Sequence, residues 1–235
     1  MLGAIAGDII GSVHEFSRNE DAGFPLFAEK SCPTDDSLLT WAVAETILRG
    51  EHDYKPRLVG MVGYYEKNGH LAPLSAAFGG GFLGWVYDGA PGERDSFGNG
   101  SAMRVSPVAW AFDDLETVLE HETLSARPSH APLAGLVRAV AESFYGPLPA
   151  LAEIRKTHAY DETCQGCVPA CLAIAVGTAD YESAVRFAAS IRGDADTLAA
   201  ITGSISQALW GLPKPIREQS LAITARCYPG MERTV

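Results

Sequence analysis

The stretch CPTDDSLLTWAVAETILRG, residues 32–50, places four oxygen-bearing side chains directly before an apolar run with helical spacing. The four residues are Thr34, Asp35, Asp36 and Ser37. One such residue is enough to cap a helix, because its side-chain oxygen accepts a hydrogen bond from a free N–H group of the first turn. The run predicts a helix that begins near Asp36 or Ser37 and ends at Gly50. The surplus of oxygen atoms indicates a second role for these residues.

Helical spacing recurs along the chain, and the alternating pattern of strands is hard to find. Residues 132–146 open with proline and end at glycine, the asymmetry expected of a helix. Further helical stretches are YESAVRFAASI (181–191), TLAAITGSISQALWG (197–211) and SAMRVSPVAWAF (101–112), the last of them interrupted by Pro107. Small residues are abundant in these stretches, which favours close helix packing. We therefore expect a mostly α-helical protein with a single domain over residues 1–235.

Composition narrows the classes of function. The 235 residues carry a formal net charge of −11, which disfavours binding to a nucleic-acid backbone, because that needs clustered Lys and Arg. No apolar run approaches ~18 residues, so we expect no membrane partner. Asp8 interrupts the apolar start of the chain, and no basic region precedes it, so we expect no signal peptide. Five cysteines are too few for a disulfide scaffold, and a reduced cytoplasmic protein is expected.

A second acidic stretch, IRGDADTLAAITGSI (191–205), places Asp194, Asp196 and Thr197 before another apolar helical run. Either stretch alone is typical of a helix N-cap. Together they offer four aspartates and two threonine hydroxyls, which are oxygen ligands suited to Mg²⁺, Mn²⁺ or Ca²⁺. Carboxylates ~5 Å apart repel by about 3 kcal/mol per pair, or roughly 20 kcal/mol over six pairs, at an effective dielectric near 20. If the aspartates converge, they must therefore take up protons or bind cations. Spacing alone cannot show that they converge.

Five motifs occur in an order that resembles a known family. They are GDIIGSVHEF (7–16), PTDDS (33–37), FGNGSAMR (97–104), CQGCVPA (164–170) and RGDADTLAAITGSI (192–205). Over nearly its whole length the chain resembles the ADP-ribosylglycohydrolases, which include the dinitrogenase-reductase-activating glycohydrolase and the ADP-ribosylhydrolases. It is similar to the shorter bacterial-type members. Two departures are mild: Ser37 stands where threonine is usual, and Arg192 with Ala195 varies the Gly-Gly-Asp-Thr/Ser-Asp pattern.

The resemblance implies a compact, orthogonal all-α bundle with a binuclear Mg²⁺ or Mn²⁺ centre in a cleft. The implied ligands form two clusters, Thr34, Asp35 and Asp36 in one and Asp194, Asp196 and Thr197 in the other. Asp35, Asp196 and Glu15 are the implied catalytic residues. Glu15 would position substrate or water near the scissile bond, facing positive charge that develops on the ribose ring. Taken alone, Glu15 is typical of a solvated glutamate near the end of a short first helix.

The resemblance also implies a substrate-binding set drawn from two glycine-rich stretches and one histidine. The set is Gly79, Gly80, Gly81, Ser96, Phe97, Gly98, Asn99, Gly100 and His130. The first three glycines match a diphosphate-binding loop, where the missing side chain lets an anion approach the backbone closely. Phe97 is expected to stack on adenine or simply to pack. His130 matches a family histidine near the nucleotide.

Cys164, Cys167 and Cys171 fall at i, i+3 and i+7, on one face of an expected helix. Zinc or an iron–sulfur cluster is an alternative that would need a fourth ligand, and the sequence does not indicate which residue that would be. A packed, reduced cysteine face is therefore the expectation. Pro169 is expected in the first turn of that helix.

These implications point to a metal-dependent hydrolase that cleaves the glycosidic bond at C1″ of ADP-ribose and releases it from a modified protein or another acceptor. One alternative is hydrolysis of another ADP-ribose derivative, an O-acyl or 1″-phosphate adduct. Another is a catalytically silent relative that binds ADP-ribose or has a structural role. The sequence leaves the leaving group open among arginine, serine, a base and a small molecule. A monomer is the expected state.

Overall fold

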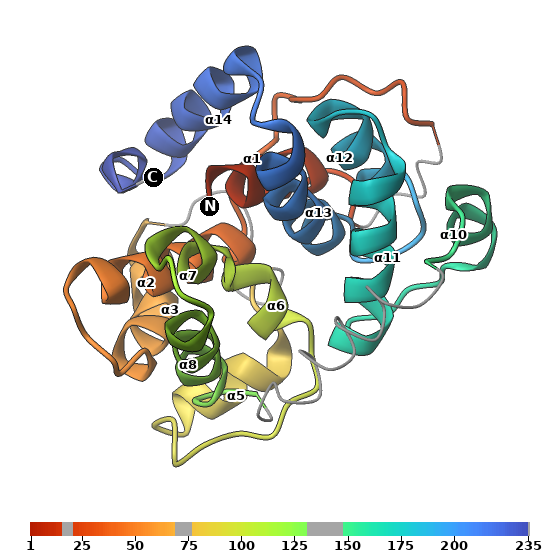
Figure 1. Cartoon of the computed structure of the whole chain (residues 1–235). Coiled ribbons are helices and arrows are strands. Elements are labelled where there is room, and N and C mark those ends of the chain that lie inside the picture. Colours follow the sequence, from red (N-terminus) through yellow and green to blue (C-terminus); the bar gives the residue numbers. More distant parts are fainter. Residues whose placement is uncertain (16–20, 69–76, 131–147, 235) are drawn as a thin grey trace.

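The computed structural model describes residues 1–15, 21–68, 77–130 and 148–234, which form helices and loops without a β-strand (Figure 1). The helices are α1 (Leu2–Gly11), α2 (Asp35–Leu48), α3 (Lys55–Asn68), α5 (Gly80–Tyr87), α6 (Gly100–Arg104), α7 (Ser106–Ala111), α8 (Leu115–Ala126), α10 (Leu151–Thr157), α11 (Cys164–Gly177), α12 (Tyr181–Ala189), α13 (Ala195–Trp210), α14 (Lys214–Cys227) and the 3₁₀ turn η1 (Met231–Arg233). The predicted all-α fold is confirmed. The helix expected over 132–146 lies outside the described residues.

Helix boundaries follow the capping chemistry, with one shift from the sequence prediction. The N-cap of α2 is Thr34, whose hydroxyl accepts from the Asp36 N–H at 3.3 Å, so the helix begins at Asp35, one or two residues earlier than expected. It ends at Leu48, and Gly50 follows with a φ of +66°. The stretch 101–112 is broken as predicted, with Val105 between α6 and α7.

The cysteine-bearing helix α11 corrects one expectation. Thr163 is its N-cap and accepts from the Gly166 N–H at 3.1 Å, while Pro169 lies inside the helix and not in its first turn. Cys164, Cys167 and Cys171 are free and buried, as a packed and reduced cysteine face requires. Among the described residues, none of them belongs to a group of three or more potential metal ligands.

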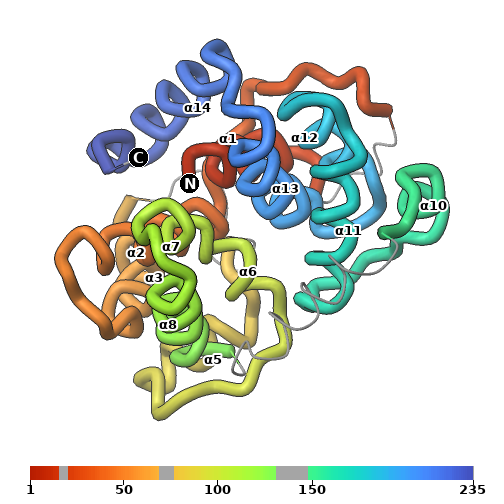
Figure 2. Tube along the Cα trace, viewed as in Figure 1, coloured from red at the N-terminus to blue at the C-terminus, as the bar shows by residue number. Residues whose placement is uncertain are grey.

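The first helix and α13 lie side by side, although nearly the whole chain separates them (Figure 2). The small residues at their contact are Gly3, Gly7 and Gly11 on α1 and Ala195, Ala199 and Gly203 on α13. A Cβ atom added to Gly7 would lie 2.6 Å from the carbonyl carbon of Ala199, so a larger side chain has no room there. This close contact brings the end of α1 against the start of α13, where the second acidic stretch lies.

Replacing Gly7 with alanine should destabilise the protein by about 3 kcal/mol, because the backbone of α13 would have to move away. Gly63→Ala is the matched control: Gly63 also lies inside a helix, α3, but a Cβ added there would have no heavy atom within 4 Å. Alanine is favoured over glycine in a helix, so Gly63→Ala should raise the free energy of unfolding by about 0.5–1 kcal/mol. Chemical denaturation measures both changes. Equal stabilities for the two variants would contradict the close contact.

Several of the remaining helices pack against this pair. The α11 and α12 helices pack on α13, and α14 packs on α1 through a small apolar cluster of Ile5, Ile9 and Ile223. A larger hydrophobic core joins these helices to α2, α3, α5 and α6. The α2 helix also contacts α1 and α13, whose first turn carries the second acidic stretch.

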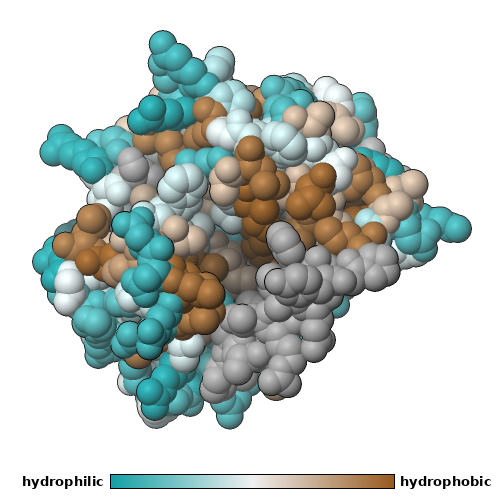
Figure 3. Space-filling model, viewed as in Figure 1, coloured by the Kyte–Doolittle hydropathy of each residue, from teal (hydrophilic) through white to brown (hydrophobic). Residues whose placement is uncertain are grey.

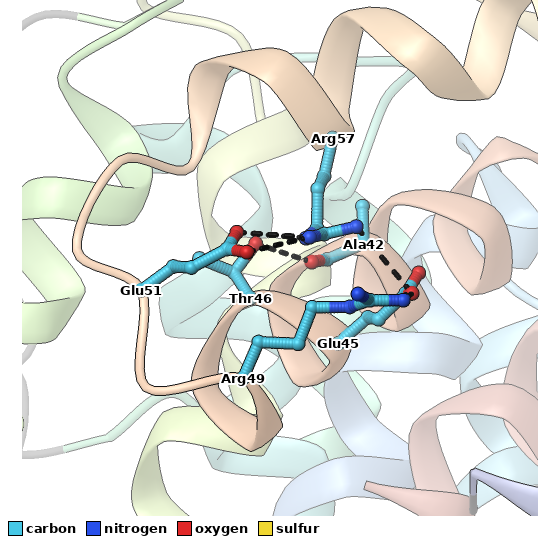
Figure 4. A network of polar contacts seen from close by, with 6 residues as sticks. All are labelled: Ala42, Glu45, Thr46, Arg49, Glu51 and Arg57. Atoms are coloured by element: carbon cyan, nitrogen blue, oxygen red, sulfur yellow. Dashed lines mark hydrogen bonds and ion pairs between the residues drawn. The ribbon is translucent and has the colours of Figure 1, made fainter.

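The far end of α2 is tied to the start of α3 by a network of ion pairs (Figure 4). Arg57 contacts Glu51 at 2.8 Å and Glu45 at 3.4 Å, and Arg49 contacts Glu45 at 2.7 Å. Such partly exposed pairs each add little to stability. Here they link Glu51, in the loop between the two helices, to Arg57 near the start of α3.

The surface mixes polar and apolar side chains. On the face drawn in Figure 3, hydrophobic residues gather in patches beside strongly hydrophilic ones. Large exposed side chains include Trp110, Leu115 and Trp210. Within the described part of the chain, no helix is both long enough and apolar enough to cross a membrane.

Candidate metal centre and cleft

The two acidic stretches meet. Asp36 lies in the first turn of α2 and Asp196 in the first turn of α13, and the Thr197 hydroxyl donates to Asp36 Oδ2 at 3.1 Å. Carboxylates form two overlapping groups, Asp8, Asp36 and Asp196 in one and Glu15, Asp194 and Asp196 in the other. Within each group, one carboxylate oxygen from each residue lies within 4.8 Å of the corresponding oxygens of the other two. The convergence that spacing could not show is therefore present, and Asp196 belongs to both groups.

Asp8 is the residue of this cluster that sequence reasoning missed. It is fully buried in α1 and accepts hydrogen bonds from the Thr34 N–H at 2.9 Å, the Thr34 hydroxyl at 2.7 Å and the Ser37 N–H at 3.1 Å. The Ser37 hydroxyl also donates to it. Through these hydrogen bonds, Asp8 connects α1 to the start of α2, where the first acidic stretch lies. A charged residue in an otherwise apolar helix was the available signal, because such a residue is rarely buried without partners.

The protein alone does not stabilise the charge of this cluster. Burial, followed by neighbouring carboxylates, holds the pKa of Asp35 and Asp36 well above the usual range. Burial and then the charge of Asp36 do the same for the pKa of Asp196. Burial raises the pKa of Asp8 to about 6, and burial with Asp194 nearby raises that of Glu15 to about 7. The group therefore favours uptake of protons or binding of cations.

The residues present fit divalent cations. Asp36 Oδ1 is buried and has no hydrogen-bond donor among the described residues. Its other oxygen accepts from Thr197, so the carboxylate is oriented with one oxygen still available. The surrounding donors are carboxylate and hydroxyl oxygens without a histidine or cysteine among them, which suits Mg²⁺, Mn²⁺ or Ca²⁺ better than zinc.

A cavity of about 450 Å³ opens beside the acidic cluster. Its lining includes every residue of the predicted site except Thr34 and Phe97. The predicted residues that line it are Glu15, Asp35, Asp36, Gly79, Gly80, Gly81, Ser96, Gly98, Asn99, Gly100, His130, Asp194, Asp196 and Thr197. The volume lies within the usual range of small-molecule sites. The cavity therefore has an acidic end and a wall built of glycine-rich turns.

The first glycine-rich turn opens helix α5. Gly79 is the N-cap and offers no side chain, so the N–H groups of Gly80 and Gly81 lack a partner within the helix. Arg94 lies over this turn, because a Cβ on Gly81 would collide with its guanidinium. Arg94 also lines the cavity. N–H groups at a helix start and a guanidinium together suit an anionic group of a ligand.

The second glycine-rich turn is tied directly to the acidic cluster. Asn99 Nδ2 donates to Asp194 Oδ2 at 2.8 Å and contacts Cys167 Sγ at 3.5 Å. The Asn99 N–H donates to the Glu162 carbonyl at 2.7 Å, next to a single antiparallel bridge between Gly98 and Thr163. The side chain of Asn99 therefore orients an aspartate of the cluster, a role that the sequence did not predict.

Two predicted residues lie outside the cavity lining. Thr34 turns its hydroxyl toward Asp8, and Phe97 is 63% exposed and so is not packed. A ligand role for Thr34 and stacking by Phe97 stay predictions. The lining also includes four polar residues that the sequence analysis did not select, Arg94, Arg104, Tyr160 and Glu162. The Tyr160 hydroxyl donates to Glu162, at the edge of the acidic end.

The fold and the site together define a class of protein, an all-helical scaffold with a buried carboxylate cluster at the end of a glycine-lined cavity. The same overall fold occurs in a solved structure named ADP-ribosylglycohydrolase-related protein complex. That structure matches 99% of this chain and 95% of its own chain, with a TM-score of 0.65 and 20% sequence identity.

Sequence comparison identifies the family. The sequence model of ADP-ribosylglycohydrolases matches residues 1–145 and 133–226, and the chain belongs to this family. It is similar to the ADP-ribosylhydrolase ARH3 of Bos taurus, with 25% identity over 194 residues that cover 67% of this chain. The chain spans about half the length of that relative, since the match covers 50% of it.

Proposed function

We propose that the protein is a metal-dependent hydrolase that cleaves the glycosidic bond at C1″ of ADP-ribose. The observation that carries the proposal is the pair of overlapping carboxylate groups that share Asp196 at the end of a cavity with glycine-rich walls. Family membership supports the same chemistry. Free ADP-ribose would be one product, and the acceptor freed of its modification would be the other.

The proposed ligands of two divalent cations, Mg²⁺ or Mn²⁺, are Thr34, Asp35, Asp36, Asp194, Asp196 and Thr197. When bound, such ions polarise oxygen atoms and lower the pKa of water. Asp8 and Asn99 would hold this set in place through the hydrogen bonds that they make to Thr34 and Asp194. The helix N-termini under Asp36 and Asp196 favour the negative charge of the carboxylates.

The remaining lining residues would bind and orient the substrate. The N–H groups of Gly80 and Gly81 and the guanidinium of Arg94 would face the diphosphate. Glu15 lies at the acidic end, where the distal ribose is proposed to sit, and would orient the attacking water or move its proton. Holding the substrate and the attacking water in one reactive geometry supplies much of the rate enhancement in such reactions.

Free ADP-ribose should bind more tightly than AMP or ribose in the presence of Mg²⁺, because only ADP-ribose places a diphosphate on the glycine-rich turns and a ribose at the acidic end. Titration calorimetry ranks the three ligands. Equal affinities for AMP and ADP-ribose would show that the acidic end does not contact the distal ribose, and the proposed pose would be wrong.

The reaction itself is tested with a panel of substrates that carry ADP-ribose on arginine, on serine, as an O-acyl ester and as the 1″-phosphate. Release of ADP-ribose is measured with EDTA and with added Mg²⁺ or Mn²⁺. Metal-dependent release from arginine or serine supports the proposal. Release from the ester or phosphate alone would replace it with the alternative hydrolase, and binding without any release would indicate a silent relative.

A further inference from the structure

Arg104 places a fixed positive charge under the wall of the cavity. Its side chain is fully buried, and a Cβ on Gly100 would lie 4.0 Å from Arg104 Nη1. Arg104 Nη2 donates to the Ser125 carbonyl at 2.9 Å and to Ser129 Oγ at 2.9 Å. Among the described residues, Arg104 Nε and Nη1 have no acceptor. In the part of the chain that the structure describes, the guanidinium is thus hydrogen-bonded from the segment around the end of α8.

The Ser129 hydroxyl can donate one hydrogen bond, and its contacts determine which neighbour accepts it. Ser129 is fully buried, and within the described part of the chain its hydroxyl contacts Arg104 Nη2 and, at 2.8 Å, His130 Nδ1. Arginine only donates, so Ser129 Oγ accepts from Arg104. If His130 Nδ1 also carried a proton, the Ser129 proton would be buried without an acceptor among these residues. With these described partners, the Ser129 hydroxyl therefore donates to His130 Nδ1.

The charges around His130 favour the same arrangement. Burial, then Arg104, then Arg94 lower the pKa of His130 far below its usual range, so the imidazole is neutral. A neutral imidazole that accepts at Nδ1 carries its proton on Nε2. That nitrogen lies against the second glycine-rich turn: a Cβ on Gly100 would be 3.2 Å from it, and a Cβ on Gly98 would be 3.7 Å from it.

We propose that Arg104, acting through Ser129, holds His130 as the neutral Nε2–H form, so that the cavity presents a fixed hydrogen-bond donor beside Gly98 and Gly100. Arg104 and Ser129 are positioning residues, and His130 is the residue that would contact the ligand. The ligand group that such a donor recognises is an acceptor oxygen of a phosphate or a ribose. The identity of that ligand as ADP-ribose rests on the proposed function, whereas the state of His130 does not.

The test uses the full-length protein labelled with ¹⁵N, without metal or ligand. Two-bond nitrogen–proton correlations report which ring nitrogen carries the proton, and His130→Gln assigns the signal. The expected result is a neutral His130 protonated at Nε2 from about pH 5.5 to 8. In Ser129→Ala the donor to Nδ1 is gone, so the Nδ1–H tautomer should become populated. Affinity for ADP-ribose should then fall about 3- to 10-fold, the value of one hydrogen bond.

Ser125→Ala is the matched control, because Ser125 is also a fully buried serine near the end of α8, but its hydroxyl donates to the Glu122 carbonyl. It should leave both the tautomer and the affinity unchanged. A wild-type His130 that carries its proton on Nδ1, or that titrates near the ordinary histidine pKa of about 6.5, would overturn the inference without any variant. An unchanged tautomer in Ser129→Ala would overturn the role of Ser129. A locked His130 in a protein that binds no ADP-ribose would support this inference and contradict the proposed function.

Discussion

Replacing Asp36 with asparagine should abolish metal binding and lower turnover by at least about 1,000-fold, the scale of the stabilisation that bound metal ions supply. Asp36 lies at the junction of the two acidic stretches, and its Oδ1 atom is buried and without a donor among the described residues. Asparagine keeps the shape of the side chain and removes its charge. Among the variants considered, this one has the largest expected effect on activity.

The same variant should be at least as stable as the wild type when metal is absent. Burial and neighbouring carboxylates raise the pKa of Asp36, so its ionised form at neutral pH destabilises the folded state, and asparagine removes that cost. In the wild type, saturation with Mg²⁺ or Mn²⁺ at about a hundred times the Kd should add about 2.7 kcal/mol of stability. Asp36→Asn should lose this metal-dependent rise in Tm.

Thermal melts after EDTA treatment and after adding metal back measure these changes, alongside an assay of ADP-ribose release. Asp180→Asn is the control, because Asp180 caps α12 outside the cavity, and asparagine is an equally good cap. It should behave as the wild type. A metal-dependent rise in Tm that persists in Asp36→Asn would remove Asp36 from the proposed ligands, and a wild type indifferent to metal would contradict the metal centre itself.

Replacing Glu15 with glutamine should lower turnover by roughly 100-fold or more and leave metal binding largely intact. Glu15 lines the cavity just beyond α1, and its carboxylate lies within 4.8 Å of ligand atoms of Asp194 and Asp196. Glutamine retains the shape of this side chain and loses its charge and basicity. The remaining carboxylates that meet at Asp196 would still hold the ions.

The two readouts separate the roles of Glu15. Bound metal and ADP-ribose release are measured together for Glu15→Gln, Asp36→Asn and Glu153→Gln, the last being an exposed glutamate in the first turn of α10. Loss of metal from Glu15→Gln would place Glu15 among the ligands, which its proximity to Asp194 allows. Full activity would mean that the residue is simply a solvated glutamate.

Local chemistry was readable from the sequence. Thr34, Asp36 and Asp196 stand before apolar runs with helical spacing, and the structure begins α2 and α13 at these places. Capping and helical periodicity depend on neighbours within a few residues, so the sequence carries them directly. Pro169 shows where such local rules fail. They place a proline in the first turn of a helix, whereas α11 contains Pro169 beyond its first turn.

Only some of the residues that line the cavity could be predicted from the sequence. The glycine-rich turns and His130 were selected through the family resemblance, and they do line the cavity. Arg94 and Arg104 also line it, but single arginines next to a turn or in a short helix look the same in sequence whether they face a cavity or solvent. Their role depends on which segments lie opposite them in space.

The sequence by itself indicated the all-α class, the helices that follow the acidic stretches and the kind of ligand that the acidic residues suit. Only the tertiary structure decided that the acidic stretches share one site and that Asp8 joins them. The physical reason is the contact of α1 with α13, where Gly3, Gly7 and Gly11 leave room for the backbone of α13 to approach. That contact brings residues from the two ends of the chain together, and spacing along the chain contains no record of it.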